Sequence, residues 1–341
     1  MTILKSFLTT LLLGSLLAAQ QSAAADGPLR VKVATLAPRG SLYHRVLQEV
    51  GESWRHAEAP GAEFIVYPDG SQGGEADVVR RMRIGQLQAA LISVVGLSEI
   101  DPSVGGLQKM PMVFQSWEEV DYVSRGVHPR IEKVFADKGY KVLFWTEAGW
   151  VRFFTKEPAT HPDDLKPRRI FAWAGDNQHA EMVRTLGYHP VVLETEDIIP
   201  GLQSGLIDTV AVTAMWALAT QIDRLAPYMV DMKWAPIIGA LVIKTETWDA
   251  MSPAGQVAIA QASSQAAQTL SDHQKRADDE AVEAMVKRGL NVQVLSPQDE
   301  AAWRRLAEAA LPMIRGRTVP AEDFDEVMRL LAEYRSKSGT Q

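Results

Sequence analysis

The first hundred residues alternate between short apolar runs and stretches typical of helices, and this alternation restricts the possible folds more than any other feature of the sequence. Residues 29–34, 63–67 and 87–95 are rich in β-branched and other apolar side chains, which predicts strands. Residues 42–57 and 75–84 lie between them and are predicted to be helices. Strands that alternate with helices in this way are typical of a parallel sheet with crossover connections, so an α/β fold is expected.

A second series of the same kind follows the first. Ligands of open α/β sheets bind beyond the carboxyl ends of the strands, so residues 36–41 and 93–96 are predicted at the rim of a cleft. We predict two α/β lobes around this cleft, with crossings at residues 146–151 and 234–239. The further predicted elements are helices at residues 117–125, 128–138, 177–186 and 196–204, and strands at residues 141–146, 191–193, 206–213 and 237–245. The last of these strands is long and apolar.

One long helix is predicted to brace both lobes. Ser252 and Pro253 suit an N-cap and a first helical position, and the next turn signal is Gly289. A helix of about 36 residues has a length of roughly 54 Å. We expect two shorter helices after it, at residues 296–311 and 321–334. The expected lobes are residues 26–149 with about 237–275 (lobe I) and residues 150–236 with about 276–341 (lobe II).

The N-terminus has the pattern of a secretory signal peptide. Lys5 precedes an apolar run at residues 7–19, and three alanines at residues 23–25 fit a cleavage site for small side chains. The run is shorter than the roughly 20 residues that cross a bilayer, so an uncleaved anchor is the weaker interpretation. We predict a signal peptide at residues 1–25 and a mature periplasmic protein that starts at Asp26 and does not span the membrane.

The composition excludes several functions. The chain has no cysteine, which rules out disulfides and a thiol nucleophile, and its net charge of -7 with dispersed basic residues argues against nucleic acid. The seven histidines lack the spacing of a zinc pair, and no serine lies in a G-x-S-x-G motif. The acidic pairs Asp163 with Asp164 and Glu194 with Glu196 are interpreted as a turn and a helix start. We therefore expect a monomer without enzymatic activity, metal or cofactor.

The stretch at residues 149–173 carries a family resemblance. Predicted strands at residues 151–154 and 170–173 bracket a proline-rich turn. The stretch is similar to G-x-R-x-x-T-x-x-x-P-I and P-x-D-L-K-G-x-K-x-R-V of the periplasmic solute receptors of tripartite ATP-independent (TRAP) transporters, of the dicarboxylate-receptor type. The matching residues are Gly149, Thr155, Pro158, Pro162, Asp164, Leu165, Lys166 and Ile170, followed by Gly187, Gly205, Ile207 and Asp208. Upstream, YPDGSQGGEADVVRRMRIGQL resembles the Y-P-x-x-Q-L-G segment of the family.

The resemblance implies a receptor that closes two lobes over a small molecule and delivers it to a membrane permease. It also implies where the ligand is held. The two arginines that in this family usually hold the ligand carboxylate fall on Val151 and Phe171, when counted from Thr155 and Ile170. A valine and a phenylalanine cannot form a bidentate pair with a carboxylate, and a buried carboxylate without a cation is costly. A neutral or largely apolar ligand is therefore predicted.

Two further polar positions of the family have changed, and an alternative remains open. The asparagine of the family falls on Val212 and its glutamate on Ser93. A shift of one residue in the strand places Arg152 at the anchor position, because neighbouring residues point to opposite faces. Arg169 shares a face with Phe171 and is a second candidate. An organic anion held by Arg152 or Arg169 is the alternative.

Tryptophans gather at predicted strand ends and crossings, where an indole that stacks on a ligand buries a large apolar area. They are Trp145, Trp150, Trp173, Trp216 and Trp234. The predicted ligand-binding residues are Trp150, Val151, Phe171, Trp173, Ser93, Val212, Trp216, Trp234, Ile237 and Arg152. A periplasmic lipid carrier, or a hydrolase or isomerase on the same scaffold, are remoter alternatives.

Overall fold

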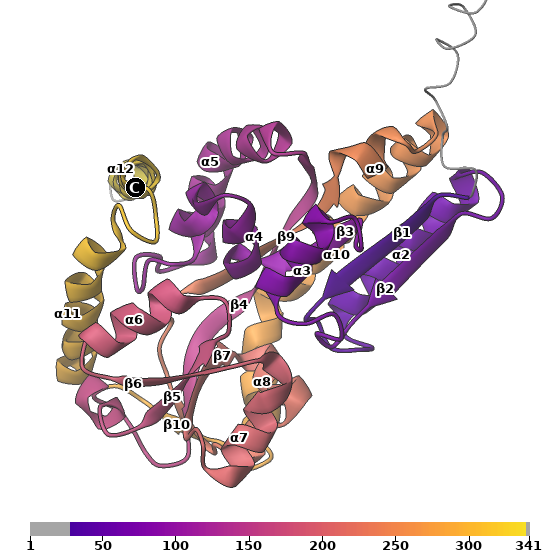
Figure 1. Ribbon diagram of the computed structural model, residues 1–341. Helices are drawn as coiled ribbons and strands as arrows, with labels where there is room; N and C mark the ends of the chain where they lie inside the picture. The colour runs from indigo at the N-terminus through magenta and orange to yellow at the C-terminus, as the bar shows by residue number, and fades with distance from the viewer. Residues whose placement is uncertain (1–27, 339–341) are drawn as a thin grey trace, which may run out of the picture.

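The computed structural model of the protein describes residues 28–338, so the predicted signal peptide at residues 1–25 lies outside the described residues. The strands form a connected mixed sheet in the order β2-β1-β3-β9-β4-β7-β5-β6, and β8 pairs with both β4 and β10. Helices lie on both sides of the sheet (Figure 1), which confirms the predicted α/β fold.

The strands are β1 (Arg30–Thr35), β2 (Glu63–Tyr67), β3 (Ala89–Ser93), β4 (Tyr140–Thr155), β5 (Arg169–Trp173), β6 (His189–Leu193), β7 (Thr209–Thr213), β8 (Tyr228–Val230), β9 (Pro236–Lys244) and β10 (Asn291–Gln293). The helices are α2 (Leu42–Ala57), α3 (Glu75–Arg83), α4 (Val94–Ile100), α5 (Trp117–Asp137), α6 (Asn177–Thr185), α7 (Ile198–Ser204), α8 (Ala214–Thr220), α9 (Thr245–Asp249), α10 (Pro253–Val286), α11 (Pro297–Ile314) and α12 (Ala321–Ser338). Short 3-10 helices are η1 (Pro102–Leu107), η2 (Pro162–Leu165), η3 (Thr195–Asp197) and η4 (Ile222–Arg224).

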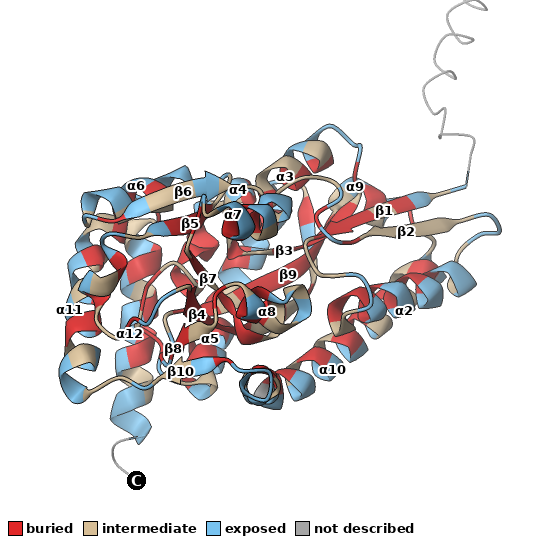
Figure 2. Ribbon diagram, turned by 90° about the horizontal axis from the view of Figure 1, so that it is seen from below, coloured by how far each residue is buried: buried red, intermediate tan, exposed pale blue. Residues whose placement is uncertain are grey.

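The first part of the chain folds as its alternating pattern predicts. β1 pairs in parallel with β2 and with β3, and the helices α2 and α3 make the crossovers. Side chains of the sheet such as Val33 and Ile92 are fully or almost fully buried. Figure 2 shows the strands mostly buried, whereas helices such as α2 expose their outer faces. Because the strands are parallel, the carboxyl ends of β1 and β3 meet at one edge of the sheet.

The strand β4 is longer than predicted and connects the two parts of the sheet. The separate strands predicted at residues 141–146 and 151–154 are in fact one strand of 16 residues. It pairs with β9 as far as Trp150 and with β7 from Val151 onward. A register shift between Glu147 and Gly149 lets the strand continue across the predicted break. Gly149 has φ 114°, and a Cβ there would lie 2.6 Å from Asp278 Oδ1, so this position requires glycine.

Two other predicted boundaries were wrong. The helices predicted at residues 117–125 and 128–138 are one helix, α5, which contains Pro129. Gly126 resembles a helix end in the sequence, but it lies against Leu330 of α12, where a Cβ would come within 2.7 Å. The strand predicted at residues 206–213 begins only at Thr209, whereas its end at Thr213 is as predicted. Thr213 caps the unpredicted helix α8 by accepting a hydrogen bond from Trp216 N.

The predicted long helix is confirmed as α10, with 34 residues. Ser252 is its N-cap, and its hydroxyl accepts a hydrogen bond from Gly255 N at 3.0 Å. Ile259 and Leu270 of α10 belong to the apolar core around β1, whereas Ala281 and Met285 belong to the core around β7. α10 therefore braces both parts of the molecule. The exact lobe boundaries stay a prediction. Among the helices of residues 28–338, none combines the length and apolar character needed to cross a membrane.

Candidate functional site

A cavity of about 300 Å³ lies at the carboxyl ends of the parallel strands, between the part of the sheet around β1 and the part around β5. Thr35, Ser93 and Trp173 line it from the last residues of β1, β3 and β5. This is the edge at which an open α/β sheet binds ligands. Both rim segments predicted from the sequence contribute to the lining, through Pro38 and Val95 among others.

The structure brings most of the predicted ligand-binding residues together around this cavity. Those that line it are Ser93, Val151, Phe171, Trp173, Val212, Trp216, Trp234 and Ile237. Trp150 and Arg152 do not line it. The residues come from β3, β4, β5, β7 and β9, from α8 and from the segment before β9, so distant parts of the chain build one site.

The alternation along β4 explains why Trp150 and Arg152 lie elsewhere. Val151 points into the cavity, so its two neighbours point to the opposite face of the strand. The Trp150 ring packs on the Trp117 ring, with centroids 4.7 Å apart. Arg152 is buried and its Nη1 donates a hydrogen bond to Asp231 at 2.8 Å. The placement of Trp150 and Arg152 in the ligand site therefore has no support in the structure.

Arg169, the other candidate anchor, does not line the cavity and lies at the first residue of β5, whereas Phe171 and Trp173 follow at the cavity end of this strand. Its guanidinium is half exposed and donates to Asp208 Oδ2 from Nε and Nη2, both at 3.2 Å. Phe171 faces the cavity two residues further along β5. The two positions counted from Thr155 and Ile170 therefore both line the cavity, and they are the apolar residues Val151 and Phe171.

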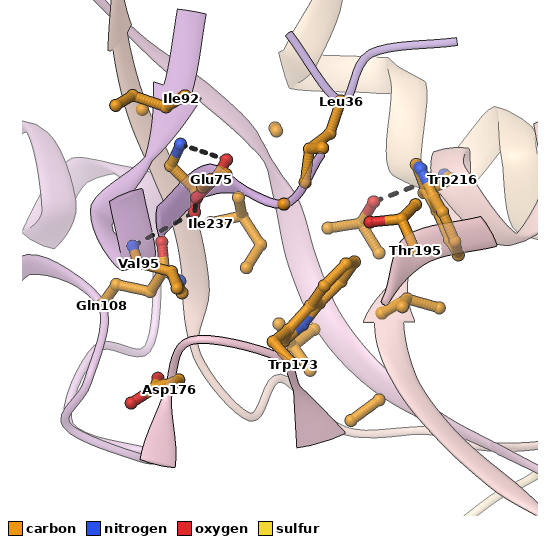
Figure 3. A pocket seen from close by; sticks show the side chains of 18 of the residues that line it. Leu36, Glu75, Ile92, Val95, Gln108, Trp173, Asp176, Thr195, Trp216 and Ile237 are labelled. Carbon is orange, nitrogen blue, oxygen red and sulfur yellow. Dashed lines mark hydrogen bonds between the residues drawn. The ribbon is translucent and has the colours of Figure 1, made fainter. Parts of the chain in front are cut away.

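Aromatic rings form one wall of the cavity. Trp173 projects into it, with Trp216 and Thr195 to one side (Figure 3). The ring centroids of Phe171 and Trp173 are 4.7 Å apart at 78°, and those of Trp173 and Trp216 are 6.1 Å apart at 67°. These edge-to-face contacts hold the rings in place and leave indole surface toward the cavity. Trp145 lies elsewhere and stacks on His128 at 4.1 Å.

The opposite side of the cavity contains a buried carboxylate that the sequence analysis missed (Figure 3). Glu75, the first residue of α3, accepts hydrogen bonds from Ser93 N at 2.7 Å, Ser93 Oγ at 2.6 Å and Gly96 N at 2.8 Å. Burial raises the pKa of Glu75, and these hydrogen bonds oppose that rise. In the sequence, a glutamate at a helix start is typical of a favourable interaction with the helix dipole, so no signal marked Glu75 as a cavity residue.

Cationic groups are scarce in the lining. Among the described residues that line the cavity, Lys109 is the sole lysine or arginine, and its Nζ lies 3.8 Å from Asp176 Oδ1. Both side chains are largely buried, at 14% and 11% exposed. His179 also lines the cavity, and burial lowers the pKa of its imidazole, so the ring is neutral near pH 7. Lys109 is thus already paired with a carboxylate of the protein.

The floor of the cavity connects to buried polar groups behind β4. Tyr43 lines the cavity, and its hydroxyl donates to the carbonyl oxygen of Glu147 at 2.5 Å and lies 3.4 Å from Gln274 Oε1. One turn further along α10, Asp278 Oδ2 accepts a hydrogen bond from Trp150 N at 2.8 Å. Burial raises the pKa of Asp278 to about 6. These contacts join the brace helix to the strand that connects the two parts of the sheet.

Within residues 28–338 no group of three or more His, Asp and Glu side chains is arranged to hold a metal ion. The polar groups at the cavity are Glu75, Gln108, Lys109, Asp176, His179, Glu194 and hydroxyl side chains, in an otherwise aromatic and aliphatic lining. Such a site can enclose a small molecule and orient it through a few polar contacts.

The chain matches a known protein family and is similar to a protein from another bacterium. Residues 33–315 match the model of a family described as "Bacterial extracellular solute-binding protein, family 7". An uncharacterised protein of Salmonella typhimurium, YiiZ, is 24% identical over 206 residues, which are 58% of this chain and 62% of that protein.

Solved structures share the fold. A TRAP periplasmic solute-binding protein from Fusobacterium nucleatum with bound sn-glycerol-3-phosphate superposes with a TM-score of 0.82 at 18% identity, over 91% of this chain and 99% of that one. Another from Shewanella oneidensis with bound succinate has a TM-score of 0.81 at 14% identity, over 89% and 100% of the two chains.

Proposed function

This chain belongs to family 7 of the bacterial extracellular solute-binding proteins, and on that premise we propose that it is the periplasmic receptor of a TRAP-type transporter for a neutral or largely apolar small molecule. This family match agrees with the resemblance of the motifs at residues 149–173 to TRAP solute receptors. In this role the protein encloses its ligand between the two lobes and delivers it to membrane permease subunits. It acts as a receptor and not as an enzyme.

One observation supports the proposed ligand class above the others: apolar side chains occupy the anchor positions. Val151, Phe171 and Val212 are each less than 9% exposed and line the cavity. An unpaired carboxylate against these side chains loses its hydration without gaining a partner, which costs several kcal/mol. A hydrocarbon or aromatic body placed there gains about 25 cal/mol for each Å² of apolar surface buried.

The alternative of an organic anion would agree with the succinate and glycerol phosphate in the two similar structures. In this chain, however, Arg152 is paired with Asp231 and Arg169 with Asp208, both away from the cavity. A lipid carrier is also less favoured, because a cavity of about 300 Å³ lies at the small end of the range for small-molecule sites.

Native mass spectrometry of the mature protein purified from a periplasm tests the proposal. We expect a bound small molecule that solvent extraction releases and that carries no carboxylate or phosphate. Phe171→Asp should lose it, because a buried charge then faces the apolar body. Val192→Asp is the matched control, since Val192 lies on the neighbouring strand β6, is 37% exposed and does not line the cavity. Identification of an organic acid as the bound compound would refute the proposed ligand class.

A further inference from the structure

The carboxylates of the cavity outnumber its cations. Glu75, Asp176 and Glu194 line it, and Lys109 is already paired with Asp176. Hydrogen bonds from Ser93 N, Ser93 Oγ and Gly96 N favour the ionised form of Glu75 and oppose the rise that burial causes in its pKa. Carboxyl groups therefore outnumber lysine and arginine in the lining, and each one that is ionised repels an anionic ligand and attracts a cationic group.

Glu194 is the carboxylate without a partner. It directly precedes η3, yet its side chain makes no capping hydrogen bond there. Within residues 28–338 no hydrogen bond or ion pair to this carboxylate is formed. Its neighbour Thr195 also lines the cavity, and Thr195 Oγ1 is buried without a hydrogen-bond partner in the described part of the chain. Two adjacent polar groups at one end of the cavity are thus available to a ligand.

The surroundings of Glu194 favour positive charge. Burial raises the pKa of Glu194, and the nearby carboxylates of Asp77, Glu196 and Asp197 raise it further. The same potential that holds a proton more tightly also attracts a cationic group. Across the cleft, a Cβ built on Gly74 would lie 2.6 Å from Glu194 Oε2, so Glu194 lies against the residue that precedes Glu75.

An indole lines the same cavity as Glu194. In the parallel pairing of β5 with β6, Trp173 is opposite Leu193, and Glu194 is the next residue. Trp173 and Glu194 both line the cavity. A carboxylate and an indole in one cavity can together bind an organic ammonium group, because both attract the cation.

We infer that the ligand is an organic cation, in which an ammonium-type or pyridinium-type group binds between Glu194 and Trp173 while an apolar body lies against Val151, Phe171 and Val212. This inference rests on the proposed receptor function and narrows its ligand class. Glu194 is then the residue that determines charge selectivity, with Thr195 Oγ1 as a further polar contact.

A matched set of probes with one ring and three charges tests the inference. The probes are 1-methylnicotinamide (cationic), nicotinamide (neutral) and nicotinate (anionic), titrated by calorimetry into the mature protein after removal of any co-purified compound. We expect 1-methylnicotinamide to bind about tenfold more tightly than nicotinamide, and nicotinate to bind most weakly. Higher salt should weaken the binding of the cation alone.

Glu194→Gln tests the charge of this side chain separately from its shape and packing, because glutamine has nearly the same shape and no charge. We expect it to reduce the preference for the cation about fivefold or more. Glu181→Gln is the control, since Glu181 is exposed on α6, pairs with Arg184 and does not line the cavity.

The outcomes distinguish this inference from the receptor proposal. Equal binding of the cationic and neutral probes, an unchanged preference in Glu194→Gln, or no binding of any probe up to about 10 mM would overturn the cation site. Equal binding of the two probes, or an unchanged preference in Glu194→Gln, would leave the receptor for a neutral ligand in place. If no probe binds, the compound identified by native mass spectrometry decides whether the receptor proposal holds. Preference for nicotinate would overturn both.

Discussion

The two faces of β4 differ in the charges that they carry: the face toward the cavity is apolar at Val151, and the rear face carries Arg152. On the cavity face, Val151 is apolar at the position where the resembled family carries an arginine. On the rear face, Arg152 pairs with Asp231, and the main chain at Trp150 donates a hydrogen bond to Asp278. Charges are therefore buried behind the strand with partners and kept away from its ligand side. A displacement of one residue along the strand would exchange these roles, which is why the face of each residue matters more than the local composition.

The largest expected effect comes from moving a charge to the cavity face. In Val151→Arg, a guanidinium enters the cavity at a position that is apolar in this chain. We expect the affinity for the natural ligand to fall about a thousandfold, equivalent to about 4 kcal/mol, and succinate to begin to bind. Calorimetry with both compounds measures this. Unchanged ligand affinity would mean that Val151 does not contact the ligand.

The next largest effect is expected in the free energy of unfolding, comes from Asp278 behind β4 and depends on pH. The pKa of Asp278 is raised from 3.8 to about 6 by burial, so the folded protein binds this proton more tightly than the unfolded chain. The resulting stabilisation is fully present below about pH 4 and is lost as the pH rises through about 6. Asp278→Asn keeps an acceptor for Trp150 N and carries no charge. We expect it to be about 2 kcal/mol more stable than the wild type at pH 8.

Urea unfolding at pH 4 and pH 8 measures this difference, which should almost vanish at pH 4. Asp279→Asn is the control, because Asp279 is the exposed neighbour on α10. The same stability difference at both pH values would show that the charge of Asp278 is not the cause.

A smaller effect is expected from removing the rear cation. Arg152→Met keeps most of the buried side-chain volume and breaks the pair with Asp231, which is 46% exposed and regains water. We expect a loss of about 1 kcal/mol in the free energy of unfolding, with ligand affinity changed less than about twofold. A strong loss of affinity in a folded Arg152→Met variant would instead support an arginine anchor.

The smallest effect is expected at Arg169. Its guanidinium is 54% exposed, and its partner Asp208 directly precedes β7, so the pair lies at the amino-terminal ends of β5 and β7. Arg169→Ala should lower the free energy of unfolding by less than about 1 kcal/mol and leave ligand affinity unchanged. The same two titrations check it, and a change in anion binding alone would revive the anchor role of Arg169.

Elements with a strong periodic signal could be predicted from the sequence. The alternation of strands and helices predicted the strands β1, β2 and β3 with helices between them, and the cap at Ser252 predicted the long helix α10. Motif spacing from Thr155 and Ile170 also placed Val151 and Phe171 on the cavity face. These features depend on local spacing, which the sequence contains directly.

Features that depend on distant contacts could not be predicted. The continuity of β4 results from a register shift beside Gly149 and from its pairing with β9, almost a hundred residues away. Glu75 and Glu194 resemble helix-start residues in the sequence and become cavity residues when the two parts of the chain meet. Trp150 resembles other cleft tryptophans, and its position on the rear face follows from the register of the folded strand.

The most direct test of the central claim is a crystal structure of the mature protein with the compound that it retains from the periplasm. We expect an apolar body in contact with Val151, Phe171 and Val212, with Arg152 still paired to Asp231 behind the strand. A carboxylate of the ligand held by Arg152 or Arg169 inside the cleft would contradict the claim.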